Sequence, residues 1–209
     1  MKVLLINGSP HENGTTAAGL SEVAAAIEAD GIETETLWIG KEPIRGCTAC
    51  FACVKKPGRC VFDGDAVNEI LGRAEGIDGL VIGSPVYWAS PNGALLSTLD
   101  RVFYAGGALF YGKPGAAVAA ARRAGTTATI DALYKYFPIN GMPIVPAQYW
   151  PMVHGRKGEE AHKDIEGMQV MRLTGHTMAW MIKAFKAADD AGIPRPAPET
   201  PRAWTNFIR

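Results

Sequence analysis

Short apolar runs alternate along the chain with stretches of helical spacing. Residues 3–6 (VLLI) form an unbroken apolar run, which is typical of a strand buried on both faces of a parallel sheet. The pattern predicts further strands at 33–38, 79–83, 116–120 and 143–149, and helices at about 16–31, 65–74, 90–102, 126–137 and 165–188. Ser90 and Pro91 are expected as the N-cap and first residue of their helix.

Strands that alternate with helices predict a parallel sheet with helices on both faces. Five such units fit an α/β, flavodoxin-like three-layer sandwich with strand order 2-1-3-4-5. We expect residues 1–190 to form this domain, followed by a proline-rich tail at 191–209 whose Trp204 and Phe207 pack on a neighbouring subunit. Ligands bind such sheets beyond the carboxyl ends of the strands, so the loops after the first, third and fourth strands are expected to meet.

The overall charge is balanced. Lys and Arg together number 21, as do Asp and Glu, in a chain that is 47% hydrophobic and 20% charged. This balance gives no reason to expect nucleic acid or an anionic membrane as a partner. The amino terminus lacks the apolar core of a signal peptide, and no stretch is long enough to span a bilayer, so we expect a cytoplasmic protein.

The loop after the first strand reads NGSPHENGTT, residues 7–16, and leads directly into a helix. Backbone N–H groups at a helix N-terminus favour an anion, and serine, histidine and threonine side chains add donors. The loop has neither G-x-G-x-x-G nor the Gly-Lys-Ser/Thr of a P-loop, and no acidic residue closes the second strand to hold a ribose. These features favour a terminal phosphate monoester, with a simple N-cap as the alternative. The candidate residues are Ser9, His11, Gly14, Thr15 and Thr16.

Two further loops carry candidate residues for a planar ring. The loop after the third strand holds two aromatic residues, and the loop after the fourth strand holds two adjacent arginines. The aromatic pair could equally belong to the core or to a dimer contact, and the arginines could be solvated surface residues. The candidates are Pro85, Val86, Tyr87, Trp88 and Ala89 in one loop, and Ala121, Arg122, Arg123 and Gly125 in the other.

The three segments NGSPHENGTT, SPVYWASPNGALLSTLDR and AAARRAG resemble the flavin loops of the NADPH-dependent FMN reductase family. The resemblance runs from residue 1 to about 190. It implies that the first loop holds the FMN phosphate, that the Pro-x-Tyr loop borders the isoalloxazine ring and that the arginine loop completes the ring site. His11 stands where arginine is frequent in the family, and Gly14 where serine is frequent.

All four cysteines lie within fourteen residues, as C-x2-C-x2-C-x6-C: Cys47, Cys50, Cys53 and Cys60. A disulfide framework is disfavoured in a cytosolic protein, and zinc is disfavoured because no histidine lies nearby. Bacterial ferredoxins use the same leading spacing. The segment resembles that of the iron–sulfur flavoprotein branch of the family, which implies a [4Fe–4S] cluster. An empty site, a redox-active pair or oxidation-labile thiols are the alternatives.

These features together predict an FMN-dependent oxidoreductase. NAD(P)H is the expected donor, NADH and NADPH are not distinguished, and the small-molecule acceptor is not identified. No catalytic side chain is named, because the flavin performs the redox chemistry. If the cluster is present, a ferredoxin-like partner is expected, and the family implies a homodimer or homotetramer. A flavodoxin-like electron carrier and a cysteine-based redox sensor are the alternatives, although carriers are usually acidic and this chain is neutral.

Two remaining features are interpreted as structural. The polar loop HGRKGEE, at residues 154–160, is expected to hang over the flavin edge with His154 solvated. Asp100 and Arg101 are read as an ion pair at the end of a helix.

Overall fold

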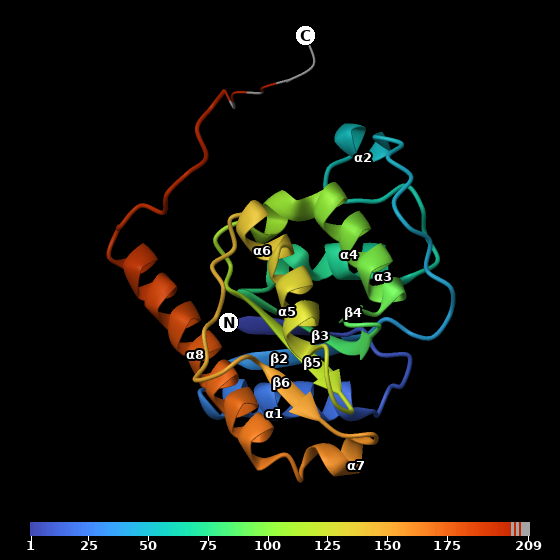
Figure 1. Ribbon diagram of the computed structural model, residues 1–209. Coiled ribbons are helices and arrows are strands. Elements are labelled where there is room, and N and C mark those ends of the chain that lie inside the picture. The colour runs from blue at the N-terminus through green and yellow to red at the C-terminus, as the bar shows by residue number, and fades with distance from the viewer. Residues whose placement is uncertain (202, 204, 206–209) are drawn as a thin grey trace.

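The computed structural model describes residues 1–201, 203 and 205, and these form a three-layer α/β sandwich (Figure 1). The central sheet has the strand order β2-β1-β3-β5-β6, and every neighbouring pair along it is parallel. This is the expected order 2-1-3-4-5. The strands are β1 (Lys2–Asn7), β2 (Glu33–Trp38), β3 (Gly79–Tyr87), β5 (Gly115–Ala121) and β6 (Met152–His154), and the two-residue β4 (Ser90–Pro91) pairs with β3 alone.

Helices cover both faces of the sheet. On one face lie α1 (Thr15–Ala29) and α8 (Ile165–Asp190), and on the other lie α3 (Ala66–Arg73), α4 (Gly93–Gly106) and α5 (Thr126–Tyr134). The short elements are α2 (Ala52–Lys55), η1 (Ala74–Gly76), η2 (Gly107–Phe110), α6 (Tyr136–Ile139) and α7 (Gly158–Ala161). Among the described residues, no helix combines the length and apolar character needed to cross a bilayer.

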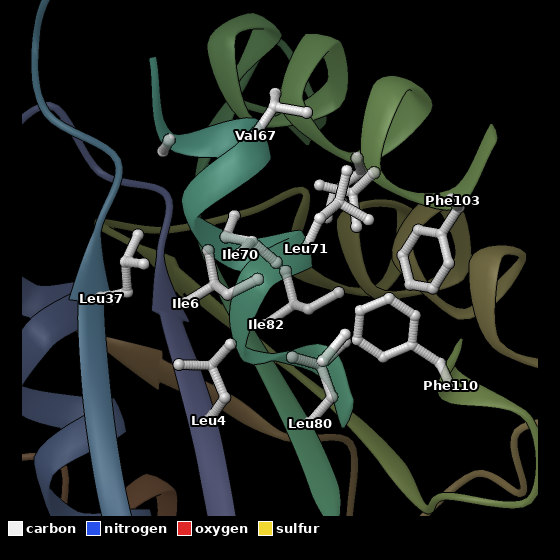
Figure 2. Close-up of a cluster of buried hydrophobic side chains, with 14 of the residues drawn as sticks. Leu4, Ile6, Leu37, Val67, Ile70, Leu71, Leu80, Ile82, Phe103 and Phe110 are labelled. Carbon is white, nitrogen blue, oxygen red and sulfur yellow. The ribbon is translucent and has the colours of Figure 1, made fainter. Parts of the chain in front are cut away.

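Strand β1, between β2 and β3, contributes to both halves of the core. Val3 and Leu5 pack against α1 and α8, whereas Leu4 and Ile6 point to the opposite face, as the two-residue period of a strand requires. Figure 2 shows Leu4 and Ile6 beneath α3, beside Ile82 of β3. All five side chains are fully buried, so the apolar run in the sequence correctly indicates a strand covered on both faces.

The predicted strand at 143–149 is wrong in its position. Ile144 makes only a single bridge to Gly115, and the regular pairing with β5 occurs instead at 152–154. Pro146 has no N–H with which to continue the ladder after Val145, whose N–H donates to the Gly115 carbonyl at 2.9 Å. The chain therefore leaves the sheet edge and returns to it at β6.

The predicted helix start at residue 90 is also wrong. Ser90 and Pro91 pair with Tyr87 and Val86 as an antiparallel hairpin, so β3 extends into the segment predicted as a loop. Helix α4 begins at Gly93, and its N-cap is Asn92, whose side chain accepts a hydrogen bond from the Ala94 N–H at 2.7 Å. Asparagine is as good an N-cap as serine, and the N-cap of α4 is Asn92, two residues after the predicted Ser90.

The tail lacks helix and strand over the described residues from 192 onward, as its proline content predicts. Its first part is attached to the domain: Arg195 donates to Asp189 of α8 at 2.9 and 2.6 Å and to the Gly112 carbonyl at 3.0 Å. Trp204 and Phe207 lie outside the described residues, so their contact with a neighbouring subunit stays a prediction.

Candidate functional site

A pocket of about 940 Å³ opens at the carboxyl ends of the strands, where the order of the sheet reverses between β1 and β3. Its volume lies within the range typical of small-molecule sites. Its walls come from five segments far apart in the chain. They are residues 9–16, Trp38 with Lys41, Pro85 with Val86, residues 120–122 and residues 155–159.

The β1–α1 loop, residues 8–14, is held in one shape by its own polar groups. Asn7 accepts from the Ser9 N–H at 3.1 Å and donates from its side-chain amide to the Glu12 carbonyl at 3.0 Å. The Ser9 hydroxyl accepts from the His11 N–H at 3.1 Å. At Gly8 a Cβ would lie 2.5 Å from the Leu95 side chain, so only glycine fits there. These contacts fix the course of the loop in front of helix α1.

Helix α1 begins at the floor of this pocket. Its N-cap is Gly14, which has no side chain to bond the first-turn N–H groups, and the first turn contains no acidic residue. Thr15 donates from its hydroxyl to the Gly155 carbonyl at 3.2 Å, whereas Thr16 is buried in the first turn. Uncapped N–H groups and the positive end of the helix dipole suit an anion. The arrangement fits the predicted phosphate monoester.

The segment 155–159 is a further wall of the pocket. A Cβ at Gly158 would lie 2.9 Å from the Asn13 carbonyl, so this glycine allows the segment to press against the β1–α1 loop. The contact places Arg156 and Lys157, both exposed, on the pocket lining beside the start of α1. The sequence predicts that the loop 154–160 lies over this sheet edge, but it does not single out Arg156 or Lys157 as binding residues.

The loop after β2 contributes two more unpredicted residues. Trp38 ends β2 and donates from Nε1 to the Ser9 carbonyl at 2.7 Å, and Lys41 follows on the pocket wall. A tryptophan at the carboxyl end of the strand next to β1 is the sequence signal that points to this place.

The segment after the third predicted strand is a hairpin with two distinct parts. Pro85 and Val86 line the pocket. Tyr87 is 46% exposed and Trp88 is 100% exposed, at a tip where Trp88 and Ala89 both have φ of +54°. Positive φ at both central residues is the geometry of a type I′ turn. Within a single chain, the tip therefore points its tryptophan into solvent and not into the pocket.

The β5–α5 loop supports this hairpin. Ala121 and Arg122 line the pocket, whereas Arg123 does not. Gly125 has φ of +93°, and a Cβ on it would lie 2.8 Å from the Ala89 Cα. Gly125 thus packs against the hairpin and does not line the pocket.

His154 is fixed, not merely solvated. It ends β6, its backbone N–H donates to Asp164 Oδ2 at 2.7 Å, and its ring Nδ1 lies 3.2 Å from the same oxygen. It is not part of the pocket lining.

The four cysteines line one small hollow of about 20 Å³ between the 47–62 segment and helix α4. Cys47 and Cys50 are exposed, Cys53 is half-buried and Cys60 is buried. Ala49 and Phe51 between them have φ of +50° and +56°. Left-handed conformations of non-glycine residues cost roughly 1–2 kcal/mol each and often mark binding sites.

The donor set suits a thiolate-ligated metal cluster. The pKa of the Cys50 thiol is lowered, chiefly because the Ala52 backbone N–H donates a hydrogen bond to its sulfur and also through Thr48. Thiolates are the form that binds iron. Over the part of the chain that the structure describes, no three metal-ligating side chains are already gathered round one point. The segment therefore supplies four thiols around one hollow, but they are not gathered round a single point.

The expected ion pair between Asp100 and Arg101 is wrong. Neighbouring residues on a helix point in different directions, so each has found another partner. Asp100 accepts from the Tyr136 hydroxyl, and Arg101 forms an ion pair with Asp65 behind the cysteine hollow.

Comparisons with known proteins agree with these features. The family model of the NADPH-dependent FMN reductases matches residues 1–157. An iron–sulfur flavoprotein of Methanocaldococcus jannaschii is 32% identical over 194 residues, covering 89% of this chain and 100% of its own. Another from Methanosarcina thermophila is 27% identical, covering 91% and 100%.

Among solved structures, RosB with a bound 8-demethyl-8-formylriboflavin-5′-phosphate intermediate is similar, with a TM-score of 0.67 and 17% identity over 100% of this chain and 96% of that one. At this identity the likeness shows the fold alone. The match of the family model over three quarters of the chain and the full-length similarity to the archaeal relative show the family. The chain belongs to the NADPH-dependent FMN reductase family, in its iron–sulfur flavoprotein branch.

Proposed function

We propose that this protein binds FMN in the 940 Å³ pocket and uses it to pass electrons from NAD(P)H to a small-molecule acceptor. The observation that carries the proposal is the uncapped start of α1 at the sheet's switch point, beneath an ordered β1–α1 loop. A phosphate monoester satisfies both the orphaned N–H groups and the helix dipole there. Membership of the family supports FMN as the molecule that carries this phosphate.

Different walls of the pocket suit different parts of FMN. His11, Arg156 and Lys157 supply side-chain donors beside the helix start, and Thr16 lies in its first turn. An apolar wall for a ring is offered by Pro85, Val86, Ala120 and Ala121. Arg122 at the mouth would favour negative charge on a reduced ring.

The chemistry supplied by bound FMN is acceptance of a hydride and release of electrons to a second molecule. No side chain of the pocket is required to move a proton for this exchange. The protein's part is to orient the ring against Pro85 and Val86 and to leave one side open to the donor.

We propose further that the four cysteines hold a [4Fe–4S] cluster. The spacing, the shared hollow and the left-handed backbone at Ala49 and Phe51 support this. Such a cluster supplies one-electron transfer. The surface around it is apolar and basic: Phe51, Val54, Val61 and Tyr104 are more than half exposed, and Lys55 and Lys56 lie beside them. An acidic, ferredoxin-like carrier would complement this surface.

The test is anaerobic reduction of the purified protein. NADPH or NADH added under argon should bleach the flavin absorbance within seconds, and an acceptor such as a quinone should restore it. Reduction by a reduced ferredoxin but not by either nucleotide would overturn the NAD(P)H-dependent reaction and favour the electron carrier. Serine substitution at Cys53 should leave nucleotide-driven bleaching intact, whereas a cysteine-based sensor would lose its response.

A further inference from the structure

Arg101 is a buried cation that the flavin site does not use. Its side chain is 1% exposed, on the inner side of α4. Burying a guanidinium is costly unless its N–H groups are paired. Arg101 makes four such contacts: an ion pair with Asp65, and hydrogen bonds to the Arg45 carbonyl at 3.2 Å, the Phe62 carbonyl at 2.8 Å and the Cys60 sulfur at 3.4 Å.

Cys60 is the most firmly held of the four cysteines. It is the buried member of the set, and both of its backbone polar groups are bound by one side chain. Asn68 of α3 accepts from the Cys60 N–H at 2.8 Å and donates to the Cys60 carbonyl at 3.0 Å. With Arg101 on its sulfur, Cys60 is fixed at backbone and side chain, whereas Cys47 and Cys50 lie on an exposed loop.

The charge next to this sulfur has a defined sign. Arg101 places a positive guanidinium and one N–H donor, Nε, against the Cys60 sulfur, and Asp65 stands on the far side of the same guanidinium. The reduction potential of an iron–sulfur cluster depends on its net charge and on hydrogen bonds to its sulfurs. A donor and a positive charge stabilise the reduced, more negative state.

We infer that Arg101 is a positioning residue that presents Cys60 to the cluster and raises the cluster's reduction potential, with Asp65 partly offsetting its charge. This inference rests on the proposed [4Fe–4S] site. A purely structural role for Arg101 would explain its hydrogen bonds to the Arg45 and Phe62 carbonyls. It does not predict that substitutions of Arg101 and of Asp65 shift the reduction potential in opposite directions.

The experiment compares three variants of the anaerobically purified holoprotein by redox titration, with cluster and flavin signals followed separately. R101Q should lower the cluster midpoint potential, because it removes the charge beside the sulfur. D65N should raise it, because it removes the opposing carboxylate, and asparagine still caps α3 at this position. R59Q is the comparison for an exposed charge: Arg59 precedes Cys60 in the chain, but its side chain is exposed and paired with Asp63. Because solvent screens this charge, R59Q should lower the potential much less than R101Q does.

Shifts of R101Q and D65N in the same direction, or no shift in R101Q, would overturn the inference. If R101Q fails to retain iron, R101K replaces it: lysine keeps the charge without the Nε contact, so a smaller downward shift is expected beside the upward shift of D65N. Wild-type protein that holds FMN but no iron would instead refute the cluster proposal itself, and this inference with it.

Discussion

Removal of the two basic residues of the 155–159 segment should weaken FMN binding selectively. We expect R156A/K157A to bind FMN less tightly than wild type and to bind riboflavin, which has no phosphate, with unchanged affinity. Both side chains are exposed on the pocket lining, so each contributes through a screened interaction of about 0.5–1 kcal/mol. Together they contribute ~1–2 kcal/mol, or a roughly 5- to 30-fold change in Kd.

The assay is quenching of flavin fluorescence on titration with apoprotein, at low and at high salt. The difference between wild type and variant should shrink as salt rises, because exposed charges are screened. K163A/K183A is the control, since both lysines are exposed and lie outside the pocket. Equal loss of FMN and riboflavin affinity would refute the reasoning, because it would show damage to the fold and not loss of a phosphate contact.

Three further predictions concern the fold. I82A removes a fully buried side chain between β3 and α3 and should lower the free energy of unfolding by about 2–5 kcal/mol in urea, whereas I139A, 81% exposed, should change it by less than about 0.5 kcal/mol. Ala89 has a left-handed backbone conformation, which costs about 1 kcal/mol for alanine and little for glycine, so A89G should raise the thermal unfolding midpoint. A lower midpoint would show that the turn is not strained. The pKa of Glu35 lies below its ordinary value of 4.5, chiefly because Lys2 and then Arg73 donate hydrogen bonds to its carboxylate. The ionised carboxylate therefore stabilises the fold above pH 4.5, and this contribution is lost as the pH falls through the lowered pKa. E35Q should therefore be less stable than wild type at pH 7 by about 1 kcal/mol or less, with a gap that closes below pH 4.5 in urea titrations; a constant gap would contradict this.

The sheet order was predictable because burial leaves a local signature. Strand β1 is apolar from Val3 to Ile6, where every side chain is fully buried, and the alternation of such runs with helical spacing is enough to specify a doubly wound sheet. The start of α1 was predictable for the same kind of reason, since the loop before it is short and rich in small polar residues.

The edges of the sheet were not predictable in this way. The pairing of Ser90–Pro91 with the end of β3, and the displacement of the last strand from 143–149 to 152–154, depend on which backbone groups find partners across the fold. The local pattern of a serine followed by a proline is typical of a helix start, and long-range pairing overrides it here.

Contacts between distant segments were likewise beyond the local pattern. Arg156 lines the pocket beside a segment whose Gly158 packs on the β1–α1 loop, and Arg101 meets Cys60 across 41 positions of sequence. In the sequence, Arg101 looks like the partner of its neighbour Asp100, and Arg156 is one charged residue of a polar loop. Their position in the fold determines whether they contact a ligand, a sulfur or water.

The measurement that tests the central claim most directly is a visible spectrum of protein purified without oxygen, with FMN, iron and acid-labile sulfide quantified per chain. We predict one FMN with about four irons and four sulfides per chain, and a broad absorbance beneath the flavin bands. FMN without iron would leave the flavin site intact and refute the cluster. Protein that takes up no FMN, even when it is supplied in excess, would contradict the account of the pocket at its foundation.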